Sequence, residues 1–86
     1  MSGGLAALSR LVRGETATIE RLDGHPDAML HLLELGLFPG EPVRVIRTAP
    51  GGDPLELDIM GYRLAIRRAE AETILVRREG GHAGAR

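Results

Sequence analysis

The chain has 86 residues, 11 basic and 12 acidic side chains, a formal net charge of −1 and no cysteine. Because nucleic-acid-binding domains neutralise phosphates and are usually strongly basic, this charge balance argues against nucleic acid as a partner. The absence of cysteine excludes a disulfide scaffold, a thiol nucleophile and any cysteine-ligated zinc or iron–sulfur site. The only aromatic side chains are Phe38 and Tyr62, too few for the stacking platform of a single-strand-binding protein.

The length and the two ends of the chain predict one small domain with loose termini. No apolar run approaches the roughly 20 residues that span a bilayer, and the first residues lack the pattern of a secretion signal. We therefore expect a cytoplasmic location without membrane insertion. We expect residues 1–4 to be a flexible N-terminus, residues 5–78 the folded domain, and the Gly-rich residues 79–86 a disordered tail.

The first folded segment, residues 5–12, fits two conformations. Leu5, Leu8 and Leu11 recur at helical spacing, which is compatible with a short helix. The same residues fit an extended segment that buries Leu8 and Leu11 before Gly14 turns the chain. The sequence leaves both conformations open.

A helix is predicted after the dipeptide that ends the first long strand. It begins at His25-Pro26-Asp27, where the Asp27 carboxylate can stabilise the free N–H groups of the first turn. Gly36 is expected to end the helix in the left-handed conformation, which places Leu37 against the last helical turn. The helix shows a broad apolar face made of Met29, Leu30, Leu32, Leu33 and Leu35.

The rest of the pattern predicts short strands joined by tight turns. Pro39 and Gly40 suit the two central positions of a type II turn, and Met60-Gly61 suits a two-residue hairpin turn. The expected strands span residues 15–22, 42–49, 54–60, 62–67 and 73–77, with a helical turn at 68–71. We therefore predict a mainly β fold, a small barrel of about five strands with one helix inserted between the first two, since closure removes exposed sheet edges.

Several segments, in this order and at these spacings, resemble the ferrous iron transport protein A (FeoA) family. The resemblance covers roughly residues 5–78. Its more specific motifs are the LLELGL-x-PG run at 32–40, the P-x-GDP loop at 50–54 and the LA-x-RR-x-EA run at 64–71.

This resemblance implies a fold, a function and a partner. The implied fold is an SH3-like β-barrel with an inserted helix, and the same barrel ends the iron-dependent repressors of the diphtheria-toxin-repressor type. The implied function is that of a cytoplasmic accessory protein of ferrous iron uptake. The implied partner is the cytosolic part of the membrane transporter FeoB, which carries a GTPase domain and which this chain would bind and modulate.

The sequence predicts no enzymatic activity. Ser2 and Ser9 lie at the N-terminal end, outside any nucleophile motif, and the carboxylates are scattered over turns and outward strand positions. The Gly-rich loop Pro50-Gly51-Gly52-Asp53 lacks the Lys-Ser/Thr ending of a phosphate-binding P-loop. We therefore expect no catalytic residues, and a role in protein–protein interaction.

Histidines are the candidates for metal binding. His25, Asp27 and His31 could contribute imidazole and carboxylate ligands to Fe²⁺ or another divalent ion. The repressor-type barrels imply ligands at the positions of His25 and Ala28, but Ala28 cannot ligate a metal, and His82 lies in the predicted tail. A solvated helix face is therefore favoured, and no cofactor is predicted. The alternative function is a metal-responsive domain that binds a transition metal ion itself.

The partner is expected to contact apolar and polar residues near the end of the helix and the hairpin tip. An apolar side chain on a tight turn is often exposed, and a cluster of such residues marks a protein interface. Barrel edges could also support a homo-oligomer. The proposed contact residues are His31, Glu34, Leu37, Phe38, Met60 and Tyr62.

Two arginine pairs, Arg67-Arg68 and Arg77-Arg78, would lie close together if the last two strands were neighbours. They would then form either a surface for an acidic partner or a solvated face balanced by Glu70, Glu72 and Glu79. The second interpretation is favoured.

Overall fold

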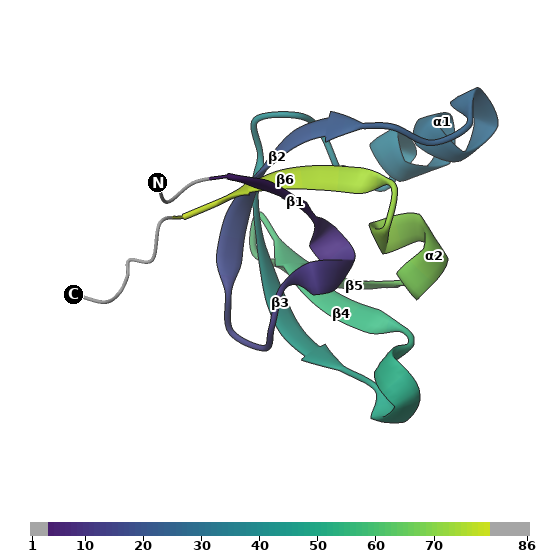
Figure 1. Cartoon of the computed structure of the whole chain (residues 1–86). Coiled ribbons are helices and arrows are strands. Elements are labelled where there is room, and N and C mark those ends of the chain that lie inside the picture. The colour runs from purple at the N-terminus through teal and green to yellow at the C-terminus, as the bar shows by residue number, and fades with distance from the viewer. Residues whose placement is uncertain (1–3, 80–86) are drawn as a thin grey trace.

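One antiparallel sheet with two short α-helices makes up the described part of the chain (Figure 1). The computed structural model describes residues 4–79, so the expectations for residues 1–3 and 80–86 lie outside the described residues. Within this range no helix is long and apolar enough to cross a membrane. With η denoting a 3-10 helix, the elements are β1 (Leu5–Ala7), η1 (Leu8–Arg10), β2 (Thr16–Leu22), α1 (Pro26–Glu34), β3 (Pro42–Thr48), η2 (Pro50–Gly52), β4 (Leu55–Ile59), β5 (Tyr62–Ile66), α2 (Arg68–Ala71) and β6 (Ile74–Arg78).

The strand order is β1-β6-β2-β3-β4-β5, and each neighbouring pair is antiparallel. Helix α1 lies between β2 and β3, the first two long strands, so the predicted mainly β fold with an inserted helix is confirmed. The predicted closure is wrong, because among the described residues β1 and β5 remain unpaired sheet edges. Helix α2 and η1 pack together on the side between these two edges (Figure 1), where strand pairing would otherwise close the barrel.

The segment that the sequence left open, residues 5–12, combines an extended part with one helical turn. Leu5–Ala7 form β1, which pairs with β6, and Leu8 begins the single turn of η1. Leu8 and Leu11 are both buried in the core. The sequence did not indicate a separate strand because its two alanines have low β propensity. Pairing with β6 therefore decides its conformation.

The β4–β5 hairpin follows directly from the sequence. Leu55, Leu57 and Ile59 are fully buried, which confirms the predicted alternation. At the turn Met60 has φ of 51° and Gly61 has φ of 88°. Two positive φ values in a two-residue loop are those of a type I′ turn, whose twist matches that of the flanking strands. The turn leaves the Met60 side chain at the hairpin tip.

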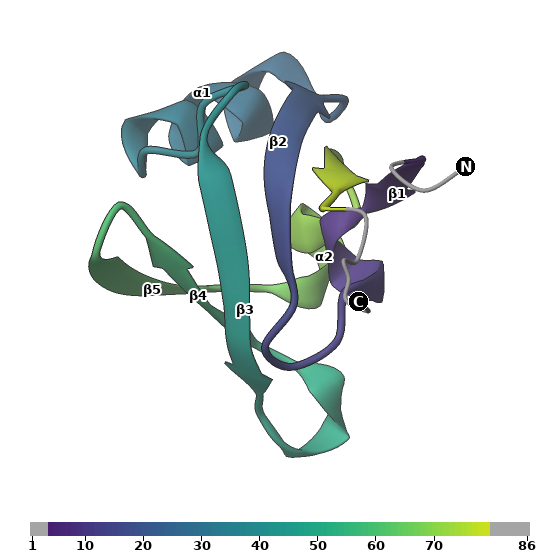
Figure 2. The same ribbon diagram turned by 90° about the vertical axis from the view of Figure 1, so that its left-hand side faces the viewer.

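The core is shared by the sheet, α1, α2 and η1. Helix α1 lies against one end of the sheet (Figure 2) and buries only Leu32 completely. Leu30 is 57% exposed, so the predicted broad apolar face is too wide, because a helix packed on one side buries only the stripe that faces the sheet. Among residues 4–79 the buried apolar side chains are Leu8, Leu11, Ala17, Ile19, Leu22, Leu32, Leu37, Val43, Val45, Leu55, Leu57, Ile59, Ile66, Ala71, Ile74 and Val76.

Arg68, at the start of α2, joins three separate segments. Its Nε donates to the Gly52 carbonyl at 2.7 Å, and its Nη1 donates to the Ser9 carbonyl at 3.0 Å. Its backbone N–H donates to the Asp53 carboxylate at 3.0 Å. The half-buried guanidinium thus connects η1 and η2 to α2. Hydrogen bonds from a charged donor are stronger than neutral ones, so this residue stabilises the open side of the sheet.

Replacing this side chain should destabilise the fold. Arg68→Ala removes both guanidinium bonds and leaves two carbonyls without that donor, and we expect a loss of about 2–3 kcal/mol in the free energy of unfolding. Urea denaturation measures the loss. Arg67→Ala is the matched control, since Arg67 is more exposed and lies 3.6 Å from Asp53; its loss should stay below about 0.5 kcal/mol. Equal losses for the two variants would contradict the role assigned to Arg68.

Candidate functional site

Helix α1 begins without a side-chain cap. His25 occupies the N-cap position but its side chain makes no capping hydrogen bond, and Pro26 follows in the first turn. Asp27 lies in the first turn, where its charge complements the positive end of the helix dipole. Both His25 and Asp27 are exposed.

The other end of α1 is a Schellman motif, as predicted. Gly36 has φ of 100°, a conformation that side chains rarely adopt. Its N–H donates to the Leu33 carbonyl at 2.9 Å, and the Leu37 N–H donates to the Leu32 carbonyl at 3.1 Å. Leu37 and Leu32 are both buried in the core. Leu37 was expected to contact a partner; this expectation is corrected, because the motif directs its side chain inward.

Tyr62 ties the β4–β5 hairpin to this helix end. Its hydroxyl donates to the Leu35 carbonyl at 2.6 Å. A Cβ atom at Gly36 would collide with the same hydroxyl, so the bond passes through space that only glycine leaves free. The end of α1 and the start of β5, which are distant in the sequence, are therefore held together (Figure 2).

Three exposed apolar side chains surround this junction, and we call them the apolar surface: Phe38, Met60 and Tyr62. They are 45%, 59% and 43% exposed, respectively. Phe38 follows the helix end in the turn closed by the Glu41 N–H to Phe38 carbonyl bond of 3.0 Å. This bond confirms the predicted turn at Pro39-Gly40, where Gly40 has φ of 94°. The surface thus rests on two tight turns and one side-chain hydrogen bond.

A shallow groove of about 270 Å³ lies beside the hairpin tip. Met60 and Gly61 line it on the hairpin side, and Pro42, the first residue of β3, lines it as well. Arg44 and Asp58, a cross-strand pair of β3 and β4, border it with opposite charges. The groove therefore offers an apolar floor beside polar groups, as protein interfaces commonly do.

The polar contact candidates on α1 lie three residues apart, so they share one face of the helix. His31 and Glu34 are exposed, and the Nε2 atom of His31 lies 3.9 Å from a carboxylate oxygen of Glu70 on α2. His31 therefore meets a residue that the sequence did not connect with it. No group of three histidine or acidic side chains that could hold a metal ion occurs within residues 4–79, so His25, Asp27 and His31 are not assembled into a site.

The two arginine pairs are separated by the topology. β6 pairs with β1 and β2 and not with β5, so the neighbouring strands assumed for Arg67-Arg68 and Arg77-Arg78 are not neighbours. Arg77 forms an ion pair with Glu20 at 3.0 Å. The Nε atom of Arg78 lies 2.9 Å from a Glu15 carboxylate oxygen, an ion pair without hydrogen-bond geometry. Neighbouring acidic groups thus balance the second pair, although not the ones expected.

The sequence matches a known family. The FeoA domain model matches residues 6–78, and the chain belongs to the FeoA family. A relative is the Fe(2+) transport protein A/Fe(2+) transporter FeoB fusion protein of Porphyromonas gingivalis, which is 36% identical over 69 residues. The aligned segment is 80% of this chain but 8% of the length of that relative.

Solved FeoA structures share the fold. FeoA protein from Chlorobium tepidum is 38% identical, with a TM-score of 0.82 over 93% of this chain and 76% of that chain. FeoA of Stenotrophomonas maltophilia, which is complexed with zinc and described as an SH3 domain protein, is 35% identical, with a TM-score of 0.72 over 83% of this chain and 88% of that chain. The expected SH3-like fold is confirmed.

The helix-end junction can be tested by a double-mutant cycle. Gly36→Ala should cost about 1–2 kcal/mol for the left-handed backbone, plus the cost of the collision with the Tyr62 hydroxyl. In a Tyr62→Phe background the collision is absent, so Gly36→Ala should cost at least about 1 kcal/mol less, as measured by urea denaturation. Costs that add to within about 0.3 kcal/mol would show that the two residues are not coupled.

Proposed function

We propose that this FeoA-family chain is a small cytoplasmic accessory protein of ferrous iron uptake. It binds the cytosolic, GTPase-bearing part of a FeoB transporter and modulates that transporter. The observation that carries the proposal is the Porphyromonas gingivalis relative, in which an FeoA segment and an FeoB transporter form one chain. Fusion gives two domains a high effective concentration for each other, which is useful when they interact. Separate chains of the two kinds would meet by binding.

The apolar surface is the proposed centre of this interface. Phe38, Met60 and Tyr62 are exposed around a junction held by hydrogen bonds, so little backbone freedom is lost when a partner covers them. Aromatic and methionine side chains are enriched at the centres of protein interfaces. Glu34 and His31, both exposed on α1, would lie at the polar margin. Leu37 supports the surface from the core.

The proposed mechanism is selective binding and not catalysis. A small domain can shift a transporter between two states only by binding one state more tightly than the other. The tight turns and the Tyr62 bond present the apolar surface in one arrangement. A transporter state whose cytosolic surface complements this arrangement would be stabilised. Whether binding activates or restrains transport depends on which of the two transporter states is stabilised.

Binding can be measured by calorimetric titration of the full chain with the cytosolic part of the FeoB transporter from the same organism. Phe38→Ala and Met60→Ala should each weaken binding by more than about 1 kcal/mol, roughly fivefold or more in Kd, as expected of interface anchors. The side chains lie at the surface, so the fold should survive both changes.

Val12→Ala is the matched control for these variants. Val12 is 66% exposed, lies in the segment that joins η1 to β2, and is not among the residues that line the groove at Met60. The Val12→Ala variant should bind the cytosolic part of the transporter with the same affinity as the unchanged chain. Losses below about 0.5 kcal/mol for both Phe38→Ala and Met60→Ala would remove the apolar surface from the interface.

A metal-binding role is the second candidate function, favoured by one contact. His31 and Glu70 bring an imidazole and a carboxylate within 3.9 Å across two helices, and both are common zinc ligands. The Stenotrophomonas maltophilia relative is complexed with zinc. Two ligands do not complete a tetrahedral site, so water or a partner side chain would supply the others.

Zinc titration followed by thermal denaturation tests this second candidate. In a His82→Ala background, which removes the histidine outside the described residues, zinc at about ten times Kd should raise Tm by about 5–10 °C. His31→Ala should abolish the rise, and His25→Ala, the control, should leave it unchanged. A Tm that millimolar zinc does not alter, or one that rises equally in His31→Ala, would exclude this site.

A further inference from the structure

Strand β1 presents unpaired backbone groups at an edge of the sheet. It is the first strand in the order β1-β6-β2-β3-β4-β5 and pairs only with β6 among the described residues. The Arg78 N–H donates to the Gly4 carbonyl at 3.5 Å, so this opposed pair is of the hydrogen-bonded kind. Such pairs alternate along an antiparallel ladder. The peptide groups of Leu5 and Ala7 therefore point away from β6, toward the free edge.

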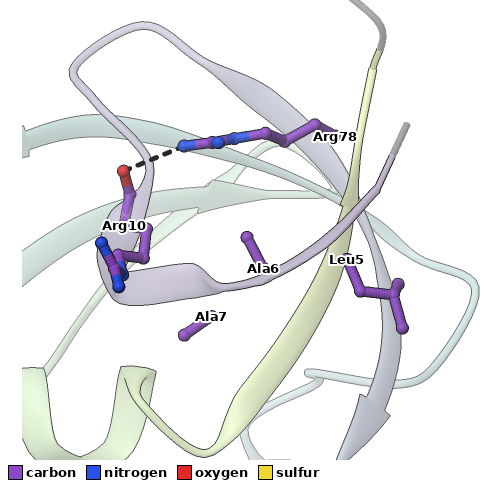
Figure 3. Close-up of a pocket in the computed structure, with 5 residues that line it drawn as sticks. All are labelled: Leu5, Ala6, Ala7, Arg10 and Arg78. Carbon is purple, nitrogen blue, oxygen red and sulfur yellow. Dashed lines mark hydrogen bonds between the residues drawn. The ribbon is translucent and has the colours of Figure 1, made fainter. Parts of the chain in front are cut away.

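A pocket of about 410 Å³ lies along this strand (Figure 3). Ala6 and Ala7 are small and leave the space open, while Leu5 lies at one end and Arg10 and Arg78 lie toward the other. The Arg78 Nη2 atom donates to the Arg10 carbonyl at 3.1 Å, which holds this guanidinium in place (Figure 3). The pocket thus combines an open strand edge with two arginine side chains.

The charges at this edge favour an acidic occupant. Glu15 forms an ion pair with Arg78 at 2.9 Å, and the Arg10 side chain is exposed. Arg10, Arg78 and Glu15 together leave this edge with a net positive charge. A second copy of the chain, paired through its own β1, would bring another edge of the same positive charge against this one, which is unfavourable. A carboxylate would instead find charge-assisted donors.

We propose that β1 binds an extended acidic segment of a protein partner, which adds a strand to this edge of the sheet. The Leu5 N–H and C=O and the Ala7 N–H pair with the backbone of the segment, and a glutamate or aspartate side chain lies against Arg10 and Arg78. Strand addition of this kind derives affinity from main-chain hydrogen bonds and specificity from the adjoining pocket. The site is at the edge opposite β5 and does not depend on the apolar surface.

The geometry of Ala7 allows a selective test. Its φ of −70° and ψ of 143° suit proline, and the preceding residue is in a strand, as a residue before proline prefers. Ala7→Pro therefore removes the outward N–H without disturbing the pairing of β1 with β6. Ala7→Ser keeps the N–H and is its matched control. Arg10→Glu reverses the charge of the pocket, and Arg63→Glu makes the same change on β5.

The probe is a capped peptide of alternating glutamate and valine, added to the full, isotope-labelled chain and followed by NMR at physiological salt. We expect the Leu5 and Ala7 amide signals to shift with millimolar peptide. Affinity should fall about tenfold or more in Ala7→Pro and in Arg10→Glu. It should stay within about twofold in Ala7→Ser and Arg63→Glu. A peptide of alternating lysine and valine should bind at least about tenfold more weakly.

Four outcomes would overturn the proposal. They are the absence of shifts at β1 with millimolar peptide, shifts centred on β5, equal binding of the lysine peptide, and unchanged affinity in Ala7→Pro. A second copy of the chain is the other possible occupant of this edge, and sedimentation of the free chain tests it. A dimer whose β1 amides are protected would assign the edge to that second copy. Because Arg10 is exposed, Arg10→Glu remains informative even if Ala7→Pro lowers stability.

Discussion

The Tyr62 hydroxyl donates a hydrogen bond to the carbonyl of Leu35, the C-cap residue of α1, beside a glycine whose missing side chain leaves room for it. At the same point Gly36 reverses the chain and directs Leu37 into the core. One helix end therefore connects the local backbone conformation, the packing of α1 on the sheet and the position of the β4–β5 hairpin. The arrangement of Phe38, Met60 and Tyr62 depends on this junction, because the first follows it in the chain and the other two are carried by the hairpin.

Among the described residues the sheet remains open, and the proposed strand addition depends on this open side. Between β1 and β5 the fold places η1 and α2, and Arg68 connects them through the Ser9 and Gly52 carbonyls. Strand closure would have satisfied both edges, whereas helical packing covers the core but leaves the backbone groups of β1 available. Its length of three residues limits uncontrolled pairing, since short edge strands are one way in which proteins avoid aggregation. The same edge can still accept a short, charge-matched segment.

The two proposed interaction sites differ in chemistry and position. The apolar surface combines aromatic and methionine side chains around a rigid junction, which suits a partner that covers it by hydrophobic burial. The β1 edge combines backbone groups with arginine, which suits an extended acidic segment. Because they lie toward opposite edges of the sheet, occupation of one leaves the other accessible. A larger partner could contact both, and each set of variants would then weaken binding independently.

Local patterns determined the parts of this protein that depend on near neighbours in the chain: the hairpin at Met60-Gly61, the helix end at Gly36, the alternation of β4 and the motifs of the FeoA family. The tertiary structure alone decided the rest. β1 exists because β6 offers an edge to two alanines with little β propensity of their own. Leu30 is exposed because α1 contacts the sheet along one narrow stripe, and His31 lies near Glu70 because the fold brings the two helices close at this point. Such contacts join residues that are distant in the sequence, so no local spacing predicts them.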